Sequence, residues 1–153
     1  MNEPVLTLQI CPLERAGKKP ALPAYQTDGA AAQDLHAFLP EGDMTVEPGA
    51  RALIPTGLTM AVPRGFGGFV LARSGLAAKS GIALANGVGL IDSDYRGEVK
   101  VAVVNLSDKP FTVRDGDRIA QFLLLPTPLF RVLETEALEE TARGAGGFGS
   151  TKV

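Results

Sequence analysis

The sequence predicts an all-β fold, either a sandwich or a barrel, with a single short helix. Two observations carry this prediction. Strand-sized apolar runs recur along the chain, and the 18 glycines and 11 prolines are spread between them as turn formers. Many short strands separated by turns are typical of β-sandwiches and β-barrels. A chain of 153 residues fits one domain, residues 1–153, that can fold unaided.

The expected strands are the apolar runs themselves. In chain order they are VLTLQI (5–10), RALIPTGLTMAV (51–62), FGGFVLA (66–72), EVKVAVVN (98–105), FTV (111–113) and RIAQFLLL (118–125). In the fourth run, Val99, Lys100 and Val101 approach the period of two that a half-buried strand shows. The turn formers of residues 114–117 separate the last two runs. Because the apolar pattern fades from about residue 135, we expect the folded body to end near Leu133.

The segment SGLAAKSG (74–81) predicts the single helix. Ser74 is a common capping residue, the residues from Leu76 to Lys79 tolerate helical backbone, and Gly81 stands where a helix would stop. Free N–H groups at the start of this helix, together with the Arg73 guanidinium, would suit a phosphate group. A plain helix cap explains the same residues, so both interpretations remain open.

Composition and charge exclude several classes of function. The formal net charge of −2 argues against a broad binding surface for nucleic acid, and no apolar run reaches the ~20 residues that a membrane helix needs. The first residues also lack the basic start and the long apolar stretch of a secretion signal. We therefore expect a cytoplasmic protein with neither a nucleic-acid nor a membrane partner.

Cysteine and histidine each occur once, which excludes a disulfide and a Cys/His zinc site within one chain. Cys11 stands at the end of an apolar stretch, and we expect it to be a small buried hydrophobe. His36 stands two residues from Asp34 on what would be one strand face. Simple packing and a catalytic pair with Asp34 are both open interpretations of this histidine.

Two further segments could carry chemistry. Residues 86–97 bring two acids, a tyrosine and an arginine close together after an apolar stretch. They form either a solvated turn or a site in which Asp92, at the edge of a packed strand, activates a water molecule. The tail RGAGGFGST (143–151) is either disordered low-complexity sequence or a segment whose Arg143 and Phe148 contact a ligand.

Taken in order, these segments resemble the five motifs of the homotrimeric dUTPase family, enzymes that hydrolyse dUTP to dUMP and pyrophosphate. The resemblance runs from about Ala30 to Thr151. Its pieces are AAAQDL (30–35), ARSGLAAKSGI (72–82), GLIDSDYRGE (89–98), GDRIAQ (116–121) and RGAGGFGST (143–151). Each piece is weak or moderate evidence alone, whereas five in the family's order are highly specific.

The resemblance implies a distorted jelly-roll β-barrel or sandwich, a homotrimer, and Mg²⁺ as the cofactor that the triphosphate brings. Residues 134–153 would form a flexible glycine-rich arm that closes over the active site of a neighbouring subunit. Asp92 would orient and deprotonate the attacking water, and Asp34 would help to hold Mg²⁺ through water. The substrate-binding residues would be Arg73, Ser74, Gly75, Asn86, Gly89, Tyr95, Gln121, Arg143, Phe148, Gly149, Ser150 and Thr151.

In that family a hairpin after the short helix reads the uracil, which implies that Asn86 assists it and that Tyr95 packs on the deoxyribose. Such an enzyme limits uracil in DNA and supplies dUMP for dTMP synthesis. The sequence departs from the family at Ala32 and at residues 152–153, where glycine is usual. The alternatives are a dCTP deaminase-like enzyme of the same fold and a non-catalytic nucleotide-binding regulatory protein. Asp92 and the intact tail both favour the dUTPase.

Overall fold

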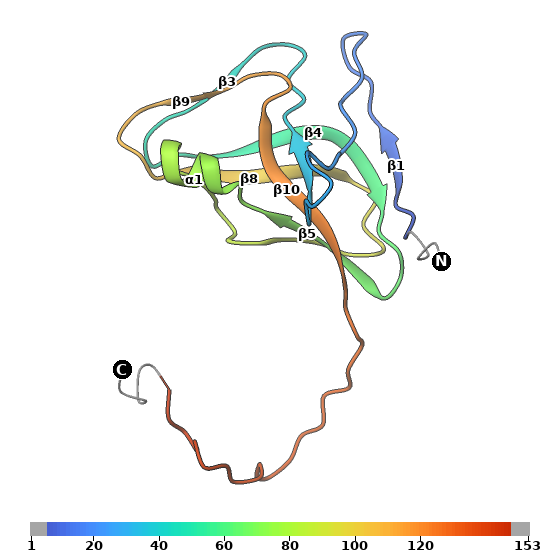
Figure 1. The fold of residues 1–153 in the computed structure, drawn as a ribbon, viewed down its shortest axis with the longest axis vertical. Coiled ribbons are helices and arrows are strands. Elements are labelled where there is room, and N and C mark those ends of the chain that lie inside the picture. The colour runs from blue at the N-terminus through green and yellow to red at the C-terminus, as the bar shows by residue number, and fades with distance from the viewer. Residues whose placement is uncertain (1–5, 148–153) are drawn as a thin grey trace.

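The protein, described here by a computed structural model over residues 6–147, is built of antiparallel sheets (Figure 1). The elements are β1 (Gln9–Pro12), β2 (Gln33–His36), β3 (Met44–Val46), β4 (Arg51–Ala61), β5 (Phe66–Leu71), α1 (Ser74–Ser80), β6 (Ile82–Leu84), β7 (Gly89–Ile91), β8 (Glu98–Asn105), β9 (Phe111–Val113) and β10 (Arg118–Pro126). One sheet has the order β1-β4-β8-β6 and another β2-β10-β5-β7, and β3 pairs with β9. The sheets stay open, so the fold is a sandwich rather than a closed barrel.

The core lies between the two four-stranded sheets. Along β8, Val99, Val101 and Val103 are buried while Lys100 is exposed, because successive side chains of a strand point to opposite faces. These valines belong to the same core cluster as Phe122 of the second sheet. The predicted all-β fold with one short helix is therefore confirmed. Packing of the core fixes the strands, and the polar residues of the candidate site follow the ends of these strands.

Five of the expected strands agree closely with the structure: β4, β5, β8, β9 and β10. The first begins later than expected, at Gln9, and pairs with β4 at the edge of its sheet. The expected apolar runs did not include β2 or the three-residue strands β3, β6 and β7. A strand face with Asp34 and His36 and a strand that ends just before Asp92 were expected separately, and they are β2 and β7. The expected hairpin after the helix is also different. Strand β6 pairs with β8 and β7 pairs with β5, so this segment joins the two sheets.

Helix α1 and its N-cap each lie one residue earlier in the chain than we expected. Its N-cap is Arg73, which makes no capping hydrogen bond through its side chain, and Ser74 is the first helical residue. The expectation that Ser74 caps the helix is therefore wrong. Gly81 ends the helix as predicted, in the left-handed conformation at φ 66°, and a Cβ there would lie 2.9 Å from Ser107 Cβ.

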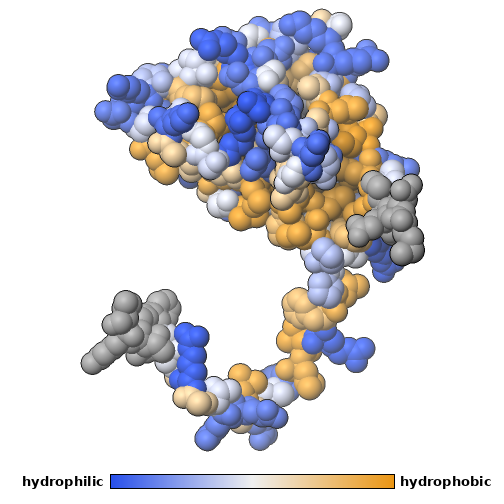
Figure 2. All heavy atoms as spheres, in the orientation of Figure 1, coloured by the Kyte–Doolittle hydropathy of each residue, from blue (hydrophilic) through white to orange (hydrophobic). Residues whose placement is uncertain are grey.

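The folded body ends before the predicted Leu133. The last strand ends at Pro126, and the Thr127 N–H donates to the Gly65 carbonyl at 2.8 Å. Beyond it the chain runs away from the sheets as an extended arm, with apolar residues along its first part (Figures 1 and 2). Phe130 is 87% exposed and Leu133 is 80% exposed. An apolar pattern shows that a segment needs a partner surface, but it does not show that this surface belongs to the same chain.

Cys11 and His36 also differ in their surroundings. Cys11 is exposed, contrary to the prediction that it is buried, because β1 is an edge strand that turns most of its residues to solvent. His36 is half-buried, and its Nδ1 atom is buried with no hydrogen-bond partner among residues 6–147. The Asp34 carboxylate pairs with arginines, which does not support a catalytic pair with His36. Among the described residues, no helix has the length and apolarity needed to cross a membrane.

Candidate active site

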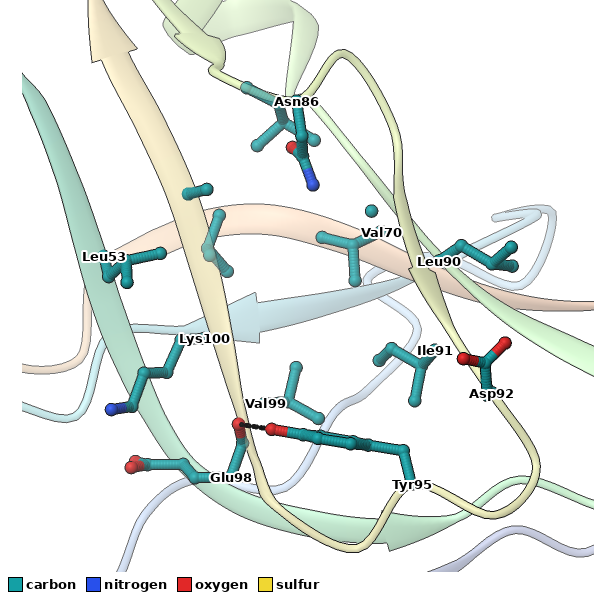
Figure 3. Close-up of a pocket in the computed structure, with 14 residues that line it drawn as sticks. Leu53, Val70, Asn86, Leu90, Ile91, Asp92, Tyr95, Glu98, Val99 and Lys100 are labelled. Carbon is teal, nitrogen blue, oxygen red and sulfur yellow. Dashed lines mark hydrogen bonds between the residues drawn. The ribbon is translucent and has the colours of Figure 1, made fainter.

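Four of the predicted site residues line one pocket between β7 of one sheet and β8 of the other. They are Asn86, Gly89, Asp92 and Tyr95, and Figure 3 shows Asn86 at one end of the pocket and Tyr95 at the other. The pocket has a volume of about 430 Å³, a size suited to a small organic ligand. Its remaining wall is largely apolar and includes Leu53, Val70, Leu84, Ile91, Val99 and Val101.

Gly89 is required where β7 passes along the pocket. A Cβ at this position would lie 2.9 Å from Val70 Cβ and 3.7 Å from the Asn86 side-chain nitrogen. Any larger residue would therefore push β7 away from β5 or fill the space beside Asn86. The main chain of β7 can approach a ligand closely only because residue 89 has no side chain.

The loop between β7 and β8 holds the acid and the aromatic residue of the pocket. Asp92 directly follows β7, and its carbonyl accepts a hydrogen bond from the Tyr95 N–H at 3.2 Å. The Arg96 guanidinium donates to the carbonyls of Ser93 and Tyr95, at 2.9 and 2.8 Å. The Tyr95 hydroxyl donates to the Glu98 carbonyl at 3.1 Å. These bonds fix the position of Asp92 relative to Tyr95 although neither lies in a strand.

Glu98 is a supporting residue that the sequence analysis missed. Its side chain is 11% exposed, and its carboxylate accepts hydrogen bonds from Arg15 at 2.7 Å and from the Gly57 N–H at 2.9 Å. Burial raises the pKa of Glu98, but these two hydrogen bonds together with the positive charges of Arg15 and Lys100 outweigh it and leave the pKa below its ordinary value. The Arg15 guanidinium lies 5.9 Å from the centre of the Phe38 ring. Glu98 therefore anchors the start of β8 as an ionised group.

A second group of polar residues lies around Asp34, whose side chain is 4% exposed. One carboxylate oxygen lies 3.6 Å from Arg73 Nε, and the other lies 3.1 Å from Arg118 Nη1. Arg73 also donates to the Arg118 carbonyl at 2.8 Å, and Gln121 pairs directly with Asp34 between β10 and β2. With Ser74 at the adjacent helix start, this arginine cluster has the chemistry of a phosphate site.

Arg118 was not among the predicted site residues, although it lies within the quoted piece GDRIAQ (116–121). Nothing in the spacing of that piece indicates that its arginine reaches a carboxylate 84 positions earlier in the chain. The contact depends on the pairing of β10 with β2. A local pattern can indicate a residue type, but the register of two distant strands decides which residues meet.

The pocket and the arginine cluster do not meet within one chain. Strand β5 pairs with β7 so that Gly68 faces Ile91, which places Asp92 near the beginning of β5. Arg73 follows the other end of β5. From Gly67 to Arg73 the chain makes six steps, which span about 20 Å because each extended residue adds ~3.3 Å. The acid of the pocket and the arginine cluster therefore lie at opposite ends of β5.

Of the predicted tail residues, only Arg143 lies within residues 6–147. It is exposed on the arm, and its Nε donates to the Gly146 carbonyl at 2.9 Å. Phe148, Gly149, Ser150 and Thr151 lie outside the described residues. The arm that carries Arg143 extends away from the sheets (Figure 1).

The described residues do not form a metal site of their own. Within residues 6–147, no group of three or more His, Cys, Asp and Glu side chains lies close enough to hold a metal ion. Both oxygens of Asp34 face guanidinium groups.

An open β-sandwich with a pocket of mixed apolar and polar lining, a carboxylate at the pocket rim and a separate arginine cluster suits an enzyme that acts on a small phosphorylated ligand. The family model described as dUTPase matches residues 18–152. The chain belongs to the dUTPase family, and it is accordingly an enzyme, a dUTP diphosphatase.

Curated relatives cover nearly the whole chain. A deoxyuridine 5'-triphosphate nucleotidohydrolase of Desulfitobacterium hafniense is 56% identical over 140 residues, which are 91% of this chain and 92% of the relative. The protein of the same name from Rhizobium leguminosarum is 55% identical over 133 residues, 86% of this chain and 85% of the relative. That of Methylocella silvestris is 49% identical over 152 residues, 99% of this chain and 94% of the relative.

Solved structures of more distant proteins share the fold. The dUTPase of Staphylococcus bacteriophage 80alpha with dUPNHPP superposes with a TM-score of 0.85 at 23% identity, over 97% of this chain and all of the other, 100%. A mutant dUTPase of phage phi11 of S. aureus, described as coordinating a structural Mg(II) ion, has a TM-score of 0.76 at 20% identity, over 88% of this chain and 100% of the other. At these identities the likeness establishes the fold.

Proposed function

We propose that the protein hydrolyses dUTP to dUMP and pyrophosphate, with Asp92 as the general base. Asp92 orients a water molecule and takes its proton while the water oxygen attacks the α-phosphorus. The bond from the α-phosphorus to the bridging oxygen of the β-phosphate breaks, and pyrophosphate leaves. The observation that carries this proposal is the position of Asp92, fixed directly after β7 at the rim of a pocket of nucleoside size.

The pocket reads the nucleoside by its shape and by its hydrogen bonds. Asn86 and the main chain near Gly89 bind the uracil edge, and Tyr95 packs on the deoxyribose. Cytosine presents the opposite pattern of donors and acceptors and would leave buried polar groups unpaired. A 2'-hydroxyl has no room beside Tyr95, and a 5-methyl group meets the main chain of the 82–91 segment. The pocket therefore excludes dCTP, UTP and dTTP.

The phosphates are bound by the arginine cluster of a neighbouring subunit in a homotrimer. Arg73, Ser74, Gly75 and Gln121 bind the phosphate oxygens, and their charge and N–H groups stabilise the negative charge of the transition state. The separation of Asp92 and Arg73 supports this assignment, because one chain places them at opposite ends of β5. Asp34 is the residue that would help to hold, through water, the Mg²⁺ brought by the triphosphate, and the ion would supply positive charge to the phosphates.

The C-terminal arm, residues 134–153, closes over the site of a neighbouring subunit. Phe148 stacks on the uracil, and Arg143, Gly149, Ser150 and Thr151 contact the phosphates. The length of the arm supports this role. The 21 steps of chain from Thr127 to Phe148 can span about 70 Å when extended, enough to reach another subunit. Closure excludes water, which strengthens the electrostatic contacts to the phosphates.

In the cell this reaction removes dUTP, which limits uracil in DNA, and supplies dUMP for dTMP synthesis. The proposed location is the cytoplasm, where the single cysteine of the chain stays a thiol. A dCTP deaminase-like activity and a purely regulatory nucleotide-binding role are not favoured. The pocket retains its carboxylate, and the relatives that match the chain are named as hydrolases of deoxyuridine triphosphate.

The deciding experiment measures pyrophosphate and ammonia released from dUTP, dCTP, dTTP and UTP in the presence of Mg²⁺. We expect pyrophosphate from dUTP, and release from each of the other three at least about 100-fold lower, because one hydroxyl or one exchanged donor changes binding by such factors. Ammonia from dCTP would replace this proposal with the deaminase. Binding of dUTP without any release would replace it with the regulatory protein.

A further inference from the structure

The Tyr95 ring occupies space that would be filled by the side chain of any residue other than glycine at position 97. Its ring folds back across the main chain of Gly97, and a Cβ on residue 97 would lie 2.6 Å from Tyr95 Cζ and closer still to the Tyr95 hydroxyl. Real Cβ atoms do not approach other atoms this closely. The missing side chain of Gly97 thus leaves the space in which the outer half of the Tyr95 ring lies.

The far end of the ring is held by a second contact. The Tyr95 hydroxyl donates to the carbonyl of Glu98 at 3.1 Å, as the dashed line in Figure 3 marks. The Glu98 carboxylate is in turn held by Arg15 and by the Gly57 N–H. The acceptor for Tyr95 therefore belongs to an anchored residue at the start of β8, so the ring has a defined position although 45% of Tyr95 is exposed.

We propose that Gly97 is a specificity-determining residue, because it fixes the Tyr95 ring as the pocket wall that excludes a 2'-hydroxyl from the sugar site. This inference rests on the proposed function, in which Tyr95 packs on the deoxyribose. Gly97 is a positioning residue that contacts no substrate. With a side chain at position 97, the ring has to swing outward, and the pocket then admits a ribonucleotide.

The substitution Gly97→Ala tests this idea cleanly. Gly97 does not have the positive φ that an L-residue resists, and the three atoms nearest to an added methyl group all belong to the Tyr95 side chain. Because an exposed ring can move more easily than backbone, we expect the fold to be retained. Gly29→Ala is a matched control, since Gly29 also lacks a positive φ and a Cβ there would meet no atom within 4 Å.

The measured quantity is kcat/KM for dUTP divided by kcat/KM for UTP. We expect this ratio to fall at least about tenfold in Gly97→Ala, the lower end of the effect of one carbon atom in a pocket, and to stay unchanged in Gly29→Ala. Tyr95→Phe, which keeps the ring and loses the bond to Glu98, should lower the ratio less. An unchanged ratio in Gly97→Ala would overturn the inference. If that variant does not fold, an unchanged ratio in Tyr95→Phe overturns it.

A double-mutant cycle separates this mechanism from a general disturbance of the loop. In a Tyr95→Ala background the ring is absent, so adding Gly97→Ala should not change the ratio further. An equal drop in both backgrounds would show that Gly97 acts without Tyr95 and would reject the inference. The wild-type enzyme is the check on the proposed function itself. If it releases no pyrophosphate from dUTP, the proposed function fails, whereas activity with an unaltered ratio rejects only the role of Gly97.

Discussion

At the scale of single residues, Asp92 and Glu98 are two carboxylates six positions apart with opposite surroundings. Asp92 is exposed at the pocket rim, where it can meet water and a phosphorus atom. Glu98 is almost enclosed and accepts hydrogen bonds from Arg15 and Gly57. The chemistry of a carboxylate is therefore set by what surrounds it, and of these two only Asp92 is available for catalysis.

Asp92→Asn should abolish most turnover without abolishing binding. The amide keeps the size of the carboxylate but cannot accept the proton of the attacking water. We expect kcat to fall by a factor of roughly 10²–10⁴, the usual contribution of a general base, and KM to change little. Steady-state pyrophosphate release measures both constants, and calorimetric binding of a non-hydrolysable analogue is the control. Turnover equal to that of the wild type would contradict the assignment of Asp92.

Glu98 should make the stability of the protein depend on acidity. Its pKa in the folded protein lies below the ordinary value of 4.5, so its contribution is fully present above that value and disappears as the pH falls through the folded pKa. Glu98→Gln should cost about 1 kcal/mol at neutral pH, a value reduced because the Arg15 side chain is 38% exposed.

The test compares thermal unfolding of the wild type and of Glu98→Gln from neutral pH down to about pH 3. The difference between the two melting temperatures should shrink as the pH drops below 4.5. A difference that is the same at both ends of the range would mean that the Glu98 charge does not stabilise the fold. Glu47→Gln is a matched comparison, because it makes the same change at an exposed glutamate.

How far single residues could be predicted depends on whether their role is local. Asp92 could be found because an acid after the apolar stretch GLI (89–91) is visible in the sequence. Arg118 and the pair Arg15 and Glu98 could not, since their contacts join positions 84 and 83 residues apart. Cys11 was placed wrongly because an apolar neighbourhood does not distinguish an edge strand from a central one.

At the scale of elements, β5 determines the geometry of the site. It lies between β10 and β7, so it fixes both the strand that leads to Asp92 and the strand that carries Gln121. Gly68 lets these strands approach, because a Cβ there would lie 2.8 Å from Phe122 Cε2. The length of this one strand keeps the proposed base and the arginine cluster apart.

The long strands could be predicted from their apolar runs, whereas among the three-residue strands only β9 was found in this way. The eight residues of β8 show the alternation of buried and exposed side chains clearly. In the three residues of β3, β6 or β7, a period of two has hardly begun, and pairing with distant strands decides their conformation. The same limit explains why the segment after the helix was expected to form a hairpin. Its sequence contains two strands and a turn, but only the register shows that the strands enter different sheets.

Deleting residues 143–153 should separate folding from catalysis. The body makes its last backbone hydrogen bond at Thr127, so the truncated chain should unfold at nearly the wild-type temperature. Without the segment that closes the site, we expect kcat/KM for dUTP to fall at least about 100-fold. Pyrophosphate release and a thermal melt measured on the same sample give both results. A truncated enzyme with full activity would show that the arm does not close the site.

At the scale of the whole molecule, two inactive variants should restore activity when they assemble into the same trimer. Asp92→Asn lacks the base and Arg73→Ala lacks a phosphate ligand, so each should be nearly inactive alone. If every site combines Asp92 of one subunit with Arg73 of the next, each mixed trimer regains one intact site. Unfolding and refolding the two variants together in equal amounts should then restore about a quarter of wild-type activity.

The control for this experiment is each variant refolded alone and the two refolded separately before mixing, which should stay inactive if subunits do not exchange. Absence of recovery after joint refolding, with trimers present by size-exclusion chromatography, would mean that Asp92 and Arg73 serve the same chain. That result would conflict with their separation along β5.

The exposed start of the arm also has a consequence for how the protein behaves when diluted. The start of the arm exposes an apolar surface that residues 6–147 of the same chain do not cover. This surface is formed by Leu129, Phe130, Val132 and Leu133. Burial of this surface between subunits would stabilise the oligomer, so the melting temperature should rise with protein concentration. Newly synthesised chains would expose the same apolar surface until they assemble. Rapid assembly would therefore reduce aggregation.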